Sequence, residues 1–399
     1  MIKPAIVAVG YNRPNGIKRL LESIGRAKYE TSDIPLIISI DESNRSDEVE
    51  KVARDFEWKY GTKEIRRFPE RQGLRKHIVQ CGDISLKYGA VIILEDDLIV
   101  AEDFYTYTCS AHEKYCKDHR ICGVSLYSYG TNVFSHIPFT PMPSVSDVYL
   151  SDMVVTWGQS WTDLQWNNFK SWYIKHEDKL PAVNPKIPKD ISSWTRSWGR
   201  YFVSYMAEKG LSYIAPYVAR TTCFADFGEH NKAKRVFNFV QVPLMNGVPK
   251  QYCFEEYENL VHYDCFYERV LKPNQEVAGI SGDKICMDVN GMKCNTLGKR
   301  FVVTNTKLPY KLITSFALTL RPISLNVIEN IPGDQLYMYE LEGGNTEIRK
   351  WSKKREEFKL SLRRLQYEYR DASWRVLLYY APLEFIVRLR DKVREKMKR

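Results

Sequence analysis

The fold is decided by the stretch AVIILEDD, residues 90–97, in which five apolar residues are followed at once by three carboxylates. A strand exposed on one face would alternate apolar and polar side chains, so an unbroken apolar run predicts a strand that is buried on both faces. Such strands occur in parallel sheets that helices cover on either side. The carboxylates would then lie at the carboxyl edge of the sheet, where ligands bind in open α/β proteins.

The residues before this stretch alternate between strand and helix patterns. Short apolar runs predict strands over residues 5–9 and 35–40, and residues 64–68 are predicted to form a third, shorter strand. Apolar residues that recur every three to four positions predict helices over residues 16–27, 47–60 and 74–87. Strands separated by helices in this way predict a doubly wound α/β fold with a layer of helices on each face of the sheet.

Further along the chain the composition changes twice. Six of the nine tryptophans lie between Trp157 and Trp198. From about residue 270, short β-like runs such as 300–304 and 311–314 are separated by turn sequences. We therefore expect an α/β domain over residues 1–265, a small β-rich accessory unit over residues 266–345 and a basic amphipathic helical tail over residues 346–399.

The positive charge of the chain is confined to its end. The net charge is +10, and residues 349–399 carry 17 Lys and Arg against 7 Asp and Glu, which leaves 42 residues of each sign in residues 1–348. A neutral body argues against nucleic-acid binding. Apolar residues of the tail recur at helical spacing among the basic ones, which favours binding to an anionic membrane surface. Packing against the α/β domain and simple solvation are the alternatives.

The start of the sequence and its cysteines predict a cytoplasmic protein. Met1 to Pro4 lead directly into the first apolar run, so no signal peptide is expected, and no apolar run reaches the roughly 18 residues that span a bilayer. The nine cysteines are widely spaced and form no Cys-x-x-Cys pair, which suits a reducing compartment. A lipid-binding tail would place the protein at the inner face of the plasma membrane.

Glu95, Asp96 and Asp97 are predicted to hold a metal ion. Adjacent carboxylates repel one another, so three together are destabilising unless a cation offsets their charge. Oxygen ligands suit Mn²⁺ or Mg²⁺, and Mg²⁺ is commonly shared between one or two carboxylates and the phosphates of a substrate. A metal in this position stabilises a departing diphosphate as a Lewis acid. The alternative is an acidic turn in which Asp97 caps the segment that follows.

This segment resembles the metal-binding segment of the GT-A-fold glycosyltransferases. The resemblance covers residues 91–98, with Asp103 and Phe104 behind them. Within this family it resembles bacterial polysaccharide-type transferases and the N-acetylglucosaminyltransferase that starts complex N-glycans. Four further segments follow the order of the family, namely GYNRP at residues 10–14, Asp41, QGLR at residues 72–75 and WGQSWT at residues 157–162. Together they imply a GT-A-like, doubly wound mixed sheet.

The resemblance also implies roles for individual residues. Contacts to the nucleotide and its phosphates fall to Asn12, Arg13, Asp41, Gly73, Arg75, Glu95 and Asp96, and the direct metal contact falls to Asp97. Arg75, near a helix start, would pair with a phosphate, whereas the alternative is a solvated helix residue. Trp157 and Trp161 would stack on sugar rings of an acceptor, or else belong to the apolar core.

The sequence departs from the family pattern at the general base. Relatives place an acid directly after a tryptophan, but here Gly199 follows Trp198. A later loop, FADFGEH at residues 224–230, resembles the family loop whose histidine closes the metal site. We therefore expect Asp226 or Glu229 to deprotonate the acceptor and His230 to contact the metal or the diphosphate. An exposed polar loop, a retaining mechanism and an inactive relative are the alternatives.

The activity that the resemblance implies is transfer of a hexosyl or N-acetylhexosaminyl group from a nucleotide sugar, assisted by Mn²⁺ or Mg²⁺. The acceptor would be a glycan or a lipid-linked glycan in surface polysaccharide synthesis. One alternative is a non-catalytic protein of the same fold that binds glycans or nucleotide sugars. Another is a sugar nucleotidyltransferase, but residues 10–16 do not supply the glycine-rich, Lys/Arg-bearing phosphate loop that this chemistry needs after the first strand.

Overall fold

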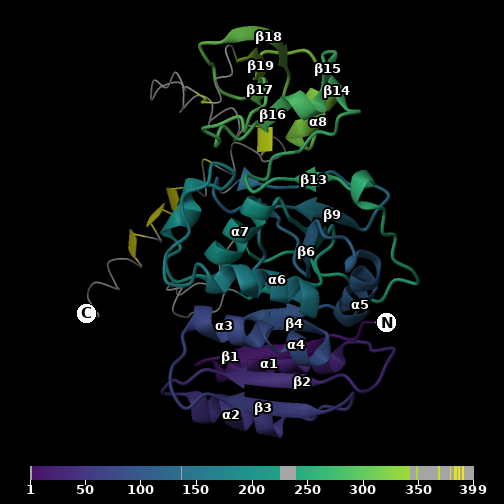
Figure 1. The fold of residues 1–399 in the computed structure, drawn as a ribbon, viewed down its shortest axis with the longest axis vertical. Helices are drawn as coiled ribbons and strands as arrows, with labels where there is room; N and C mark the ends of the chain where they lie inside the picture. The colour runs from purple at the N-terminus through teal and green to yellow at the C-terminus, as the bar shows by residue number, and fades with distance from the viewer. Residues whose placement is uncertain are drawn as a thin grey trace.

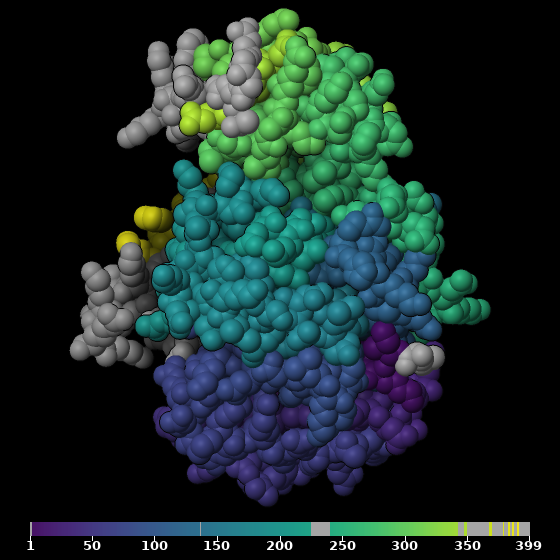
Figure 2. Space-filling view, in the orientation of Figure 1, coloured from purple at the N-terminus to yellow at the C-terminus, as the bar shows by residue number. Residues whose placement is uncertain are grey.

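A nine-stranded mixed sheet with helices on both faces forms the larger part of the protein (Figure 1). The computed structural model describes residues 2–135, 137–224 and 240–341, followed by residues 347–348, 367–368, 378, 382–383, 385–386 and 389–390. The predicted α/β class is confirmed. A smaller sheet lies at one end of the long axis (Figure 1). The N-terminal strands lie at the opposite end, so residue number increases broadly along this axis (Figure 2).

The large sheet is parallel around its first strands and mixed beyond them. In order across the sheet, its strands are β13 (His262–Tyr263), β9 (Val148–Ser151), β11 (Ser212–Pro216), β6 (Ile121–Ser125), β10 (Gln159–Thr162), β4 (Ala90–Glu95), β1 (Ala5–Gly10), β2 (Leu36–Ile40) and β3 (Lys63–Arg67). β4, β1, β2 and β3 run parallel to one another. β10 runs antiparallel between β4 and β6, which makes the sheet mixed.

Two helix layers cover this sheet because successive residues of a strand point to opposite faces. α1 (Pro14–Arg26), α2 (Ser46–Asp55) and α5 (Phe104–Tyr115) pack on the face that holds Ile38 and Ile92. α3 (Leu74–Gly82), α6 (Asp163–Ile174) and α7 (Trp198–Lys209) pack on the face that holds Val7 and Ile93. The unbroken apolar runs of the sequence therefore correspond to strands buried on both sides.

One predicted helix ends earlier than expected, and another is divided in two. α2 stops at Asp55 rather than at residue 60, because Phe56 leaves helical geometry and packs its ring against Gly25 of α1. The helix expected over residues 74–87 divides into α3 and α4 (Ser85–Tyr88). At the break, Asp83 accepts hydrogen bonds from Trp166 Nε1 (2.8 Å) and Lys170 Nζ (2.9 Å) on α6. In both places a tertiary contact outweighs the helical pattern.

The smaller sheet forms a β-rich unit with its own apolar core. In order across the sheet, its strands are β16 (Ile285–Asp288), β17 (Phe301–Thr304), β19 (Leu336–Glu340) and β18 (Lys311–Phe316). The hairpin of β14 (Glu276–Val277) and β15 (Ile280–Ser281) and the helix α8 (Ile323–Ile328) pack on this core. Further short elements are β7 (Thr131–Asn132), β8 (Ile137–Pro138), η2 (Tyr257–Asn259) and η3 (Gly282–Lys284). The boundaries predicted for the three parts of the chain stay predictions.

Among the residues that the structure describes, we find no helix with the length and apolarity of a membrane span. All nine cysteines are free thiols. Most of residues 349–399 lie outside the described residues, so the amphipathic helix expected there stays a prediction.

Candidate active site

Parallel strand ends bring the predicted donor residues to one edge of the sheet. β1 lies between β2 and β4, so Gly10, Ile40 and Glu95 lie side by side at the carboxyl edge. The N–H of Asp41 donates to the carbonyl of Gly10 (3.0 Å), which fixes the loops after β1 and β2 beside each other. Asn12 lies half-buried in the first of these loops. This edge is the predicted ligand site.

Arg13 joins the loop after β1 to the acidic residues after β4. Its guanidinium forms an ion pair with Asp96 and contacts Asp97 Oδ2 at 3.3 Å. α1 starts directly after Arg13, and a Cβ on Gly16, in its first turn, would come within 2.6 Å of the Asp96 carbonyl oxygen. Glycine at this position therefore allows α1 to approach the acidic segment.

The three carboxylates carry more negative charge than Arg13 offsets. Burial, with the charges of Asp97 and Asp96, raises the pKa of Glu95 to about 8. Burial also raises the pKa of Asp96 to about 6, against the opposing effect of Arg13. Although burial works in the other direction, the charges of Asp96 and Asp97 hold the pKa of Arg13 above its ordinary value. A further cation at this edge would stabilise the ionised carboxylates.

These residues fit a divalent cation that takes few ligands from the protein. The side chain of Asp97 is 20% exposed, and Asp96 Oδ2 is buried with no hydrogen-bond partner among the described residues. Within the same residues, no three His, Cys, Asp or Glu side chains converge on one point. One or two carboxylates suit Mn²⁺ or Mg²⁺, because Mg²⁺ in particular keeps part of its coordination for water and phosphates.

Asp41 is held by backbone N–H groups. Its Oδ1 accepts hydrogen bonds from Glu42 (2.9 Å) and Gln72 (2.7 Å), and its Oδ2 accepts one from Gly73 (2.9 Å). Gly73 has a φ of 75°, which favours glycine, and α3 begins at the next residue. Asp41 is only 3% exposed. Its evident role is to position the turn before α3, and the contact to a base or ribose stays a prediction.

Arg75 is directed to α7. Its Nη1 donates to the hydroxyl of Tyr201 (2.6 Å), and its guanidinium lies 5.0 Å from the centre of the same ring. The structure therefore brings Arg13, Asp96 and Asp97 into contact, whereas the side chain of Arg75 contacts Tyr201 instead. Pairing of Arg75 with a phosphate stays a prediction.

The two tryptophans of the segment 157–162 have different environments. Trp161 in β10 is fully buried, with the rings of Trp166 and Phe202 at 4.9 Å and 5.4 Å between centroids. Trp157, just before β10, is half-buried and contacts the ring of Tyr127 at 5.0 Å. Trp161 belongs to the core, whereas Trp157 lines a cavity.

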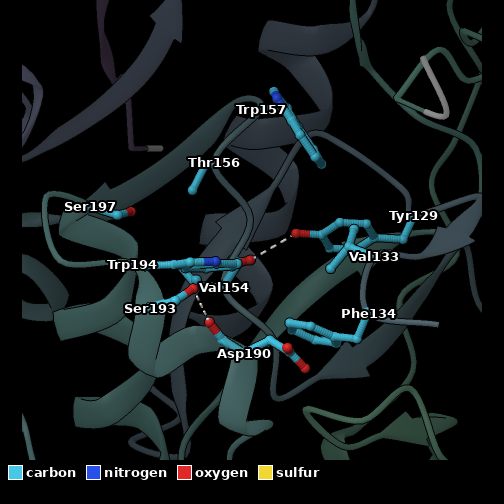
Figure 3. A pocket seen from close by; sticks show the side chains of 10 residues that line it. All are labelled: Tyr129, Val133, Phe134, Val154, Thr156, Trp157, Asp190, Ser193, Trp194 and Ser197. Carbon is cyan, nitrogen blue, oxygen red and sulfur yellow. Dashed lines mark hydrogen bonds between the residues drawn. The ribbon is translucent and has the colours of Figure 1, made fainter. Parts of the chain in front are cut away.

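This cavity has a volume of about 490 Å³ and combines aromatic rings with polar groups (Figure 3). Phe134 and Trp194 are stacked, with 6.3 Å between their centroids and 23° between their planes. Aromatic faces beside hydroxyl groups and a carboxylate suit a sugar, which presents both C–H and O–H groups. The lining residues are Tyr129, Val133, Phe134, Val154, Thr156, Trp157, Asp190, Ser193, Trp194 and Ser197.

The cavity adjoins the acidic segment. β10, which begins two residues after Trp157, pairs with β4 with Gln159 opposite Ile93, two residues before Glu95. The carbonyl of Trp157 accepts a hydrogen bond from Thr221 Oγ1 (2.5 Å). Thr221 belongs to β12 (Thr221–Cys223), which pairs with β5 (Leu98–Val100) directly after the acidic residues. The donor edge and the cavity are therefore neighbours.

Gly199, where the family pattern would place an acid, does not line the cavity but lies beside Ser197 and Thr156, which do. A Cβ on Gly199 would lie 3.2 Å from Ser197 Oγ and 3.3 Å from Thr156 Cγ2, which leaves little room for a larger side chain. The acid that lines the cavity is instead Asp190, in the short helix η1 (Lys189–Ser193). Sequence reasoning missed Asp190, for which the tryptophan-rich composition of the segment was the available signal.

The segment that carries Asp190 is fixed by a buried arginine. Arg200 of α7 is 7% exposed and donates to the carbonyls of Ser192 and Pro181, the latter at 2.9 Å. The hydroxyl of Ser193 donates to the carbonyl of Asp190 at 2.6 Å (Figure 3). These contacts position η1 against the start of α7 and so shape the cavity.

The predicted base and histidine, Asp226, Glu229 and His230, lie outside the described residues. Of the described residues that flank the stretch 225–239, Phe224 contacts the acidic segment and Val240 packs in the apolar core before it. The N–H of Phe224 donates to the carbonyl of Asp97 (2.7 Å), and Val240 belongs to the same apolar cluster as Leu94. The roles of the three residues stay predictions.

No protein-family model and no curated protein matches the chain. Solved structures that resemble it include glycosyltransferases, the class implied by the sequence motifs. TarS 1–349 from S. aureus, in complex with UDP-GlcNAc, is 10% identical over 58% of this chain and 61% of that chain, with a TM-score of 0.36. The mannosyltransferase PcManGT from Pyrobaculum calidifontis, in complex with GDP-Man and Mn²⁺, is 13% identical over 54% and 55% of the two chains, with a TM-score of 0.33. GalNAc-T7 with UDP, GalNAc and Mn²⁺ is 11% identical over 55% and 42%, with a TM-score of 0.37.

The chain thus spans less than two thirds of the length of each of these structures. TM-scores at this level do not support an activity by themselves. The function below rests on the residues of the site.

Proposed function

We propose that the protein transfers a sugar from a nucleotide-diphosphate donor to a saccharide acceptor with the help of a divalent cation. The observation that carries this proposal is the sheet edge at which Asp96 and Asp97, two of three adjacent carboxylates, share the Arg13 guanidinium beside an aromatic cavity. The edge suits a metal-bound diphosphate and the cavity suits a sugar.

At the donor edge, Asp97 is the proposed direct ligand of Mn²⁺ or Mg²⁺. Arg13 contacts Asp97 at 3.3 Å while it pairs with Asp96, and so orients both carboxylates. The bound metal supplies Lewis-acid stabilisation of the departing diphosphate. Glu95, Asn12 and Arg75 are proposed to complete the contacts to the nucleotide and its phosphates, and Asp41 and Gly73 to set the turn before α3.

At the cavity, a saccharide acceptor would pack its C–H face on Trp157, Trp194 or Phe134 and bond its hydroxyls to polar groups of the wall. The attacking hydroxyl must lose a proton to a base. Asp190 at the cavity is one candidate, and Asp226 and Glu229 are the candidates predicted from the sequence. His230 stays the proposed last contact of the metal or the diphosphate.

Donor binding is tested by the thermal unfolding midpoint with a panel of nucleotide sugars, including UDP-GlcNAc and GDP-Man, with and without Mn²⁺. A ligand at 100 times its Kd stabilises the folded state by about 2.7 kcal/mol. We expect Asp97→Asn to abolish the metal-dependent rise of the midpoint. The matched control is Asp178→Asn, which changes an exposed carboxylate that neither lines the cavity nor pairs with Arg13. A full metal-dependent rise in Asp97→Asn would exclude Asp97 as the metal ligand.

The base is identified by comparing Asp190→Asn, Asp226→Asn and Glu229→Gln at saturating donor. General-base catalysis contributes about 10²- to 10⁴-fold, so one variant should lose turnover on that scale while it keeps donor binding. The other two should stay within a few-fold of the wild type. If all three stay there, none is the base and a retaining mechanism becomes the better proposal.

A non-catalytic protein that binds glycans or nucleotide sugars is the second candidate function, and Gly199 is the observation that favours it. Slow release of UDP or GDP from a bound nucleotide sugar separates the two, because only an enzyme turns over its donor. A sugar nucleotidyltransferase is disfavoured, since Arg13 is the single Lys or Arg of residues 10–16 and is paired with Asp96.

Surface polysaccharide synthesis and membrane association through residues 349–399 remain parts of the proposal. Sedimentation with anionic vesicles, with and without residues 349–399, tests the membrane contact. Equal sedimentation of both forms would remove the tail from the proposal.

A further inference from the structure

A second cavity, of about 260 Å³, lies between the α/β domain and the β-rich unit. Its wall on one side comes from the end of α7, the start of β11 and part of the segment 257–270. On the other side it comes from β16 and part of the segment 293–299. No residue of the donor edge or of the aromatic cavity lines it. The proposed transfer reaction gives this cavity no role.

Basic side chains outnumber acidic ones on the wall of this cavity. Four cationic residues face two carboxylates, namely Lys186, Arg269, Lys293 and Lys299 against Asp152 and Asp264. Both carboxylates are already engaged: Asp264 pairs with Lys293, and Asp152 is 2.7 Å from His262 Nε2. The other three cations of the wall therefore have no carboxylate of the same wall as a partner.

Lys186, Lys299 and Arg269 are the unmatched cations. Each donates to a backbone carbonyl, Lys186 at 3.3 Å and Arg269 at 3.2 Å. Within the described part of the chain, none of the three has a carboxylate oxygen within 4.0 Å. A backbone carbonyl carries only a partial charge, so these contacts satisfy hydrogen bonds without neutralising the cations.

One of these cations is buried and a second is half-buried. Arg269 is 4% exposed, and burial lowers the pKa of Arg269. Lys299 is half-buried, and burial lowers its pKa although the charge of Asp283 opposes this effect. Taking a cation out of water without a counter-charge is destabilising, so such groups are usually paired or bind an ion. The Thr296 hydroxyl on the same wall is buried and makes no hydrogen bond among the described residues.

We propose that this cavity binds a small ligand through a phosphate group. A phosphate monoester carries about −1.5 to −2 charges at neutral pH, which matches the excess of two cations on the wall. Its oxygens accept hydrogen bonds from ammonium, guanidinium and hydroxyl groups alike. A cavity of about 260 Å³ holds the phosphate and a group the size of one sugar ring, and excludes a nucleotide sugar. The site is independent of the proposed transfer reaction.

Calorimetric titration of the full chain tests this site with inorganic phosphate and with glucose 1-phosphate. Ionic strength is held constant and EDTA is present, so that phosphate held by a metal at the donor edge does not contribute. Glucose and glucuronate are the uncharged and the carboxylated comparisons. We expect both phosphate compounds to bind, glucose not to bind, and glucuronate to bind at least about tenfold more weakly than glucose 1-phosphate.

Lys186→Gln and Lys299→Gln are expected to weaken the binding of glucose 1-phosphate by about tenfold or more, the scale for removing one charged contact. Lys186 is exposed, so Lys186→Gln keeps the test valid if Lys299→Gln does not fold. The matched control is Lys284→Gln, an exposed lysine of the β-rich unit that does not line the cavity and should bind as the wild type does.

The proposal is overturned if the wild type binds neither phosphate compound, or if glucuronate binds as tightly as glucose 1-phosphate. It is also overturned if Lys186→Gln binds like the control. Loss of binding in Arg13→Ala, with no loss in Lys186→Gln, would locate the phosphate at the donor edge instead. None of these results depends on transferase activity.

Discussion

Replacement of Asp41 by asparagine tests whether this residue supports the fold of the donor edge or contacts the donor. Its carboxylate accepts three backbone N–H bonds, from Glu42, Gln72 and Gly73, at 2.7–2.9 Å. A hydrogen bond to a charged group contributes about 1.5–3 kcal/mol. Asparagine keeps one acceptor oxygen but turns an NH₂ group toward backbone N–H groups. We expect the free energy of unfolding to fall by about 2–4 kcal/mol.

Guanidinium unfolding followed by tryptophan fluorescence measures this change. Seven of the nine tryptophans lie in residues 1–265 and none lies between residues 271 and 341, so the signal reports mainly on the α/β domain. Asp178→Asn, an exposed change of the same chemistry, should stay within about 0.5 kcal/mol of the wild type. The donor-dependent rise of the thermal midpoint is recorded on the same samples.

A structural role predicts that Asp41→Asn is destabilised and that its folded fraction, assayed well below the midpoint, binds the donor within a few-fold of the wild type. The opposite pattern, with stability equal to that of Asp178→Asn and no donor binding, would refute the reasoning. Asp41 would then be the contact to the base or ribose that the sequence motif implies.

Three further changes test other parts of the structure. Gly16→Ala should cost about 1–3 kcal/mol of stability and weaken donor binding, because its Cβ would meet the Asp96 carbonyl at 2.6 Å; wild-type stability and binding would contradict this contact. Burial lowers the pKa of His112 to about 3, below the roughly 6.5 of an unfolded chain, so stability that is present above pH 6.5 is lost as the pH falls toward 3. The loss at pH 4 is about 3 kcal/mol, and His112→Gln should flatten the pH dependence of urea unfolding by that amount; an unchanged slope between pH 7 and pH 4 would show that His112 does not cause it. Arg200→Lys should loosen the segment that carries Asp190, since a lysine cannot reach both carbonyls that Arg200 binds. Limited trypsin digestion should then cut at Lys186 or Lys189 several times faster with donor binding unchanged, and equal digestion rates would mean that Arg200 does not hold the segment.

The sequence by itself determined the first four strands of the α/β domain, the helices between them and the position of the acidic residues, whereas the strands and helices of this domain after residue 103 were not predicted. Burial on both faces of β1, β2 and β4 requires unbroken apolar runs, and this local pattern is visible without coordinates. The same pattern fixes where β4 ends, so Glu95, Asp96 and Asp97 could be assigned to the carboxyl edge. Helix ends were less predictable, because Phe56 and Asp83 stop their helices through contacts with α1 and α6.

The composition of the site was decided by the tertiary structure. The pairing of Arg13 with Asp96 spans 83 residues, and no local pattern records it. The role of Asp41 depends on N–H groups more than thirty residues away, which use its oxygens for the turn before α3. Asp190 faces the cavity only because Arg200 ties its segment to α7, and the phosphate cavity exists only where the β-rich unit meets the end of α7. Charges and aromatic rings form a site when the fold removes them together from water, and that depends on long-range packing rather than on spacing along the chain.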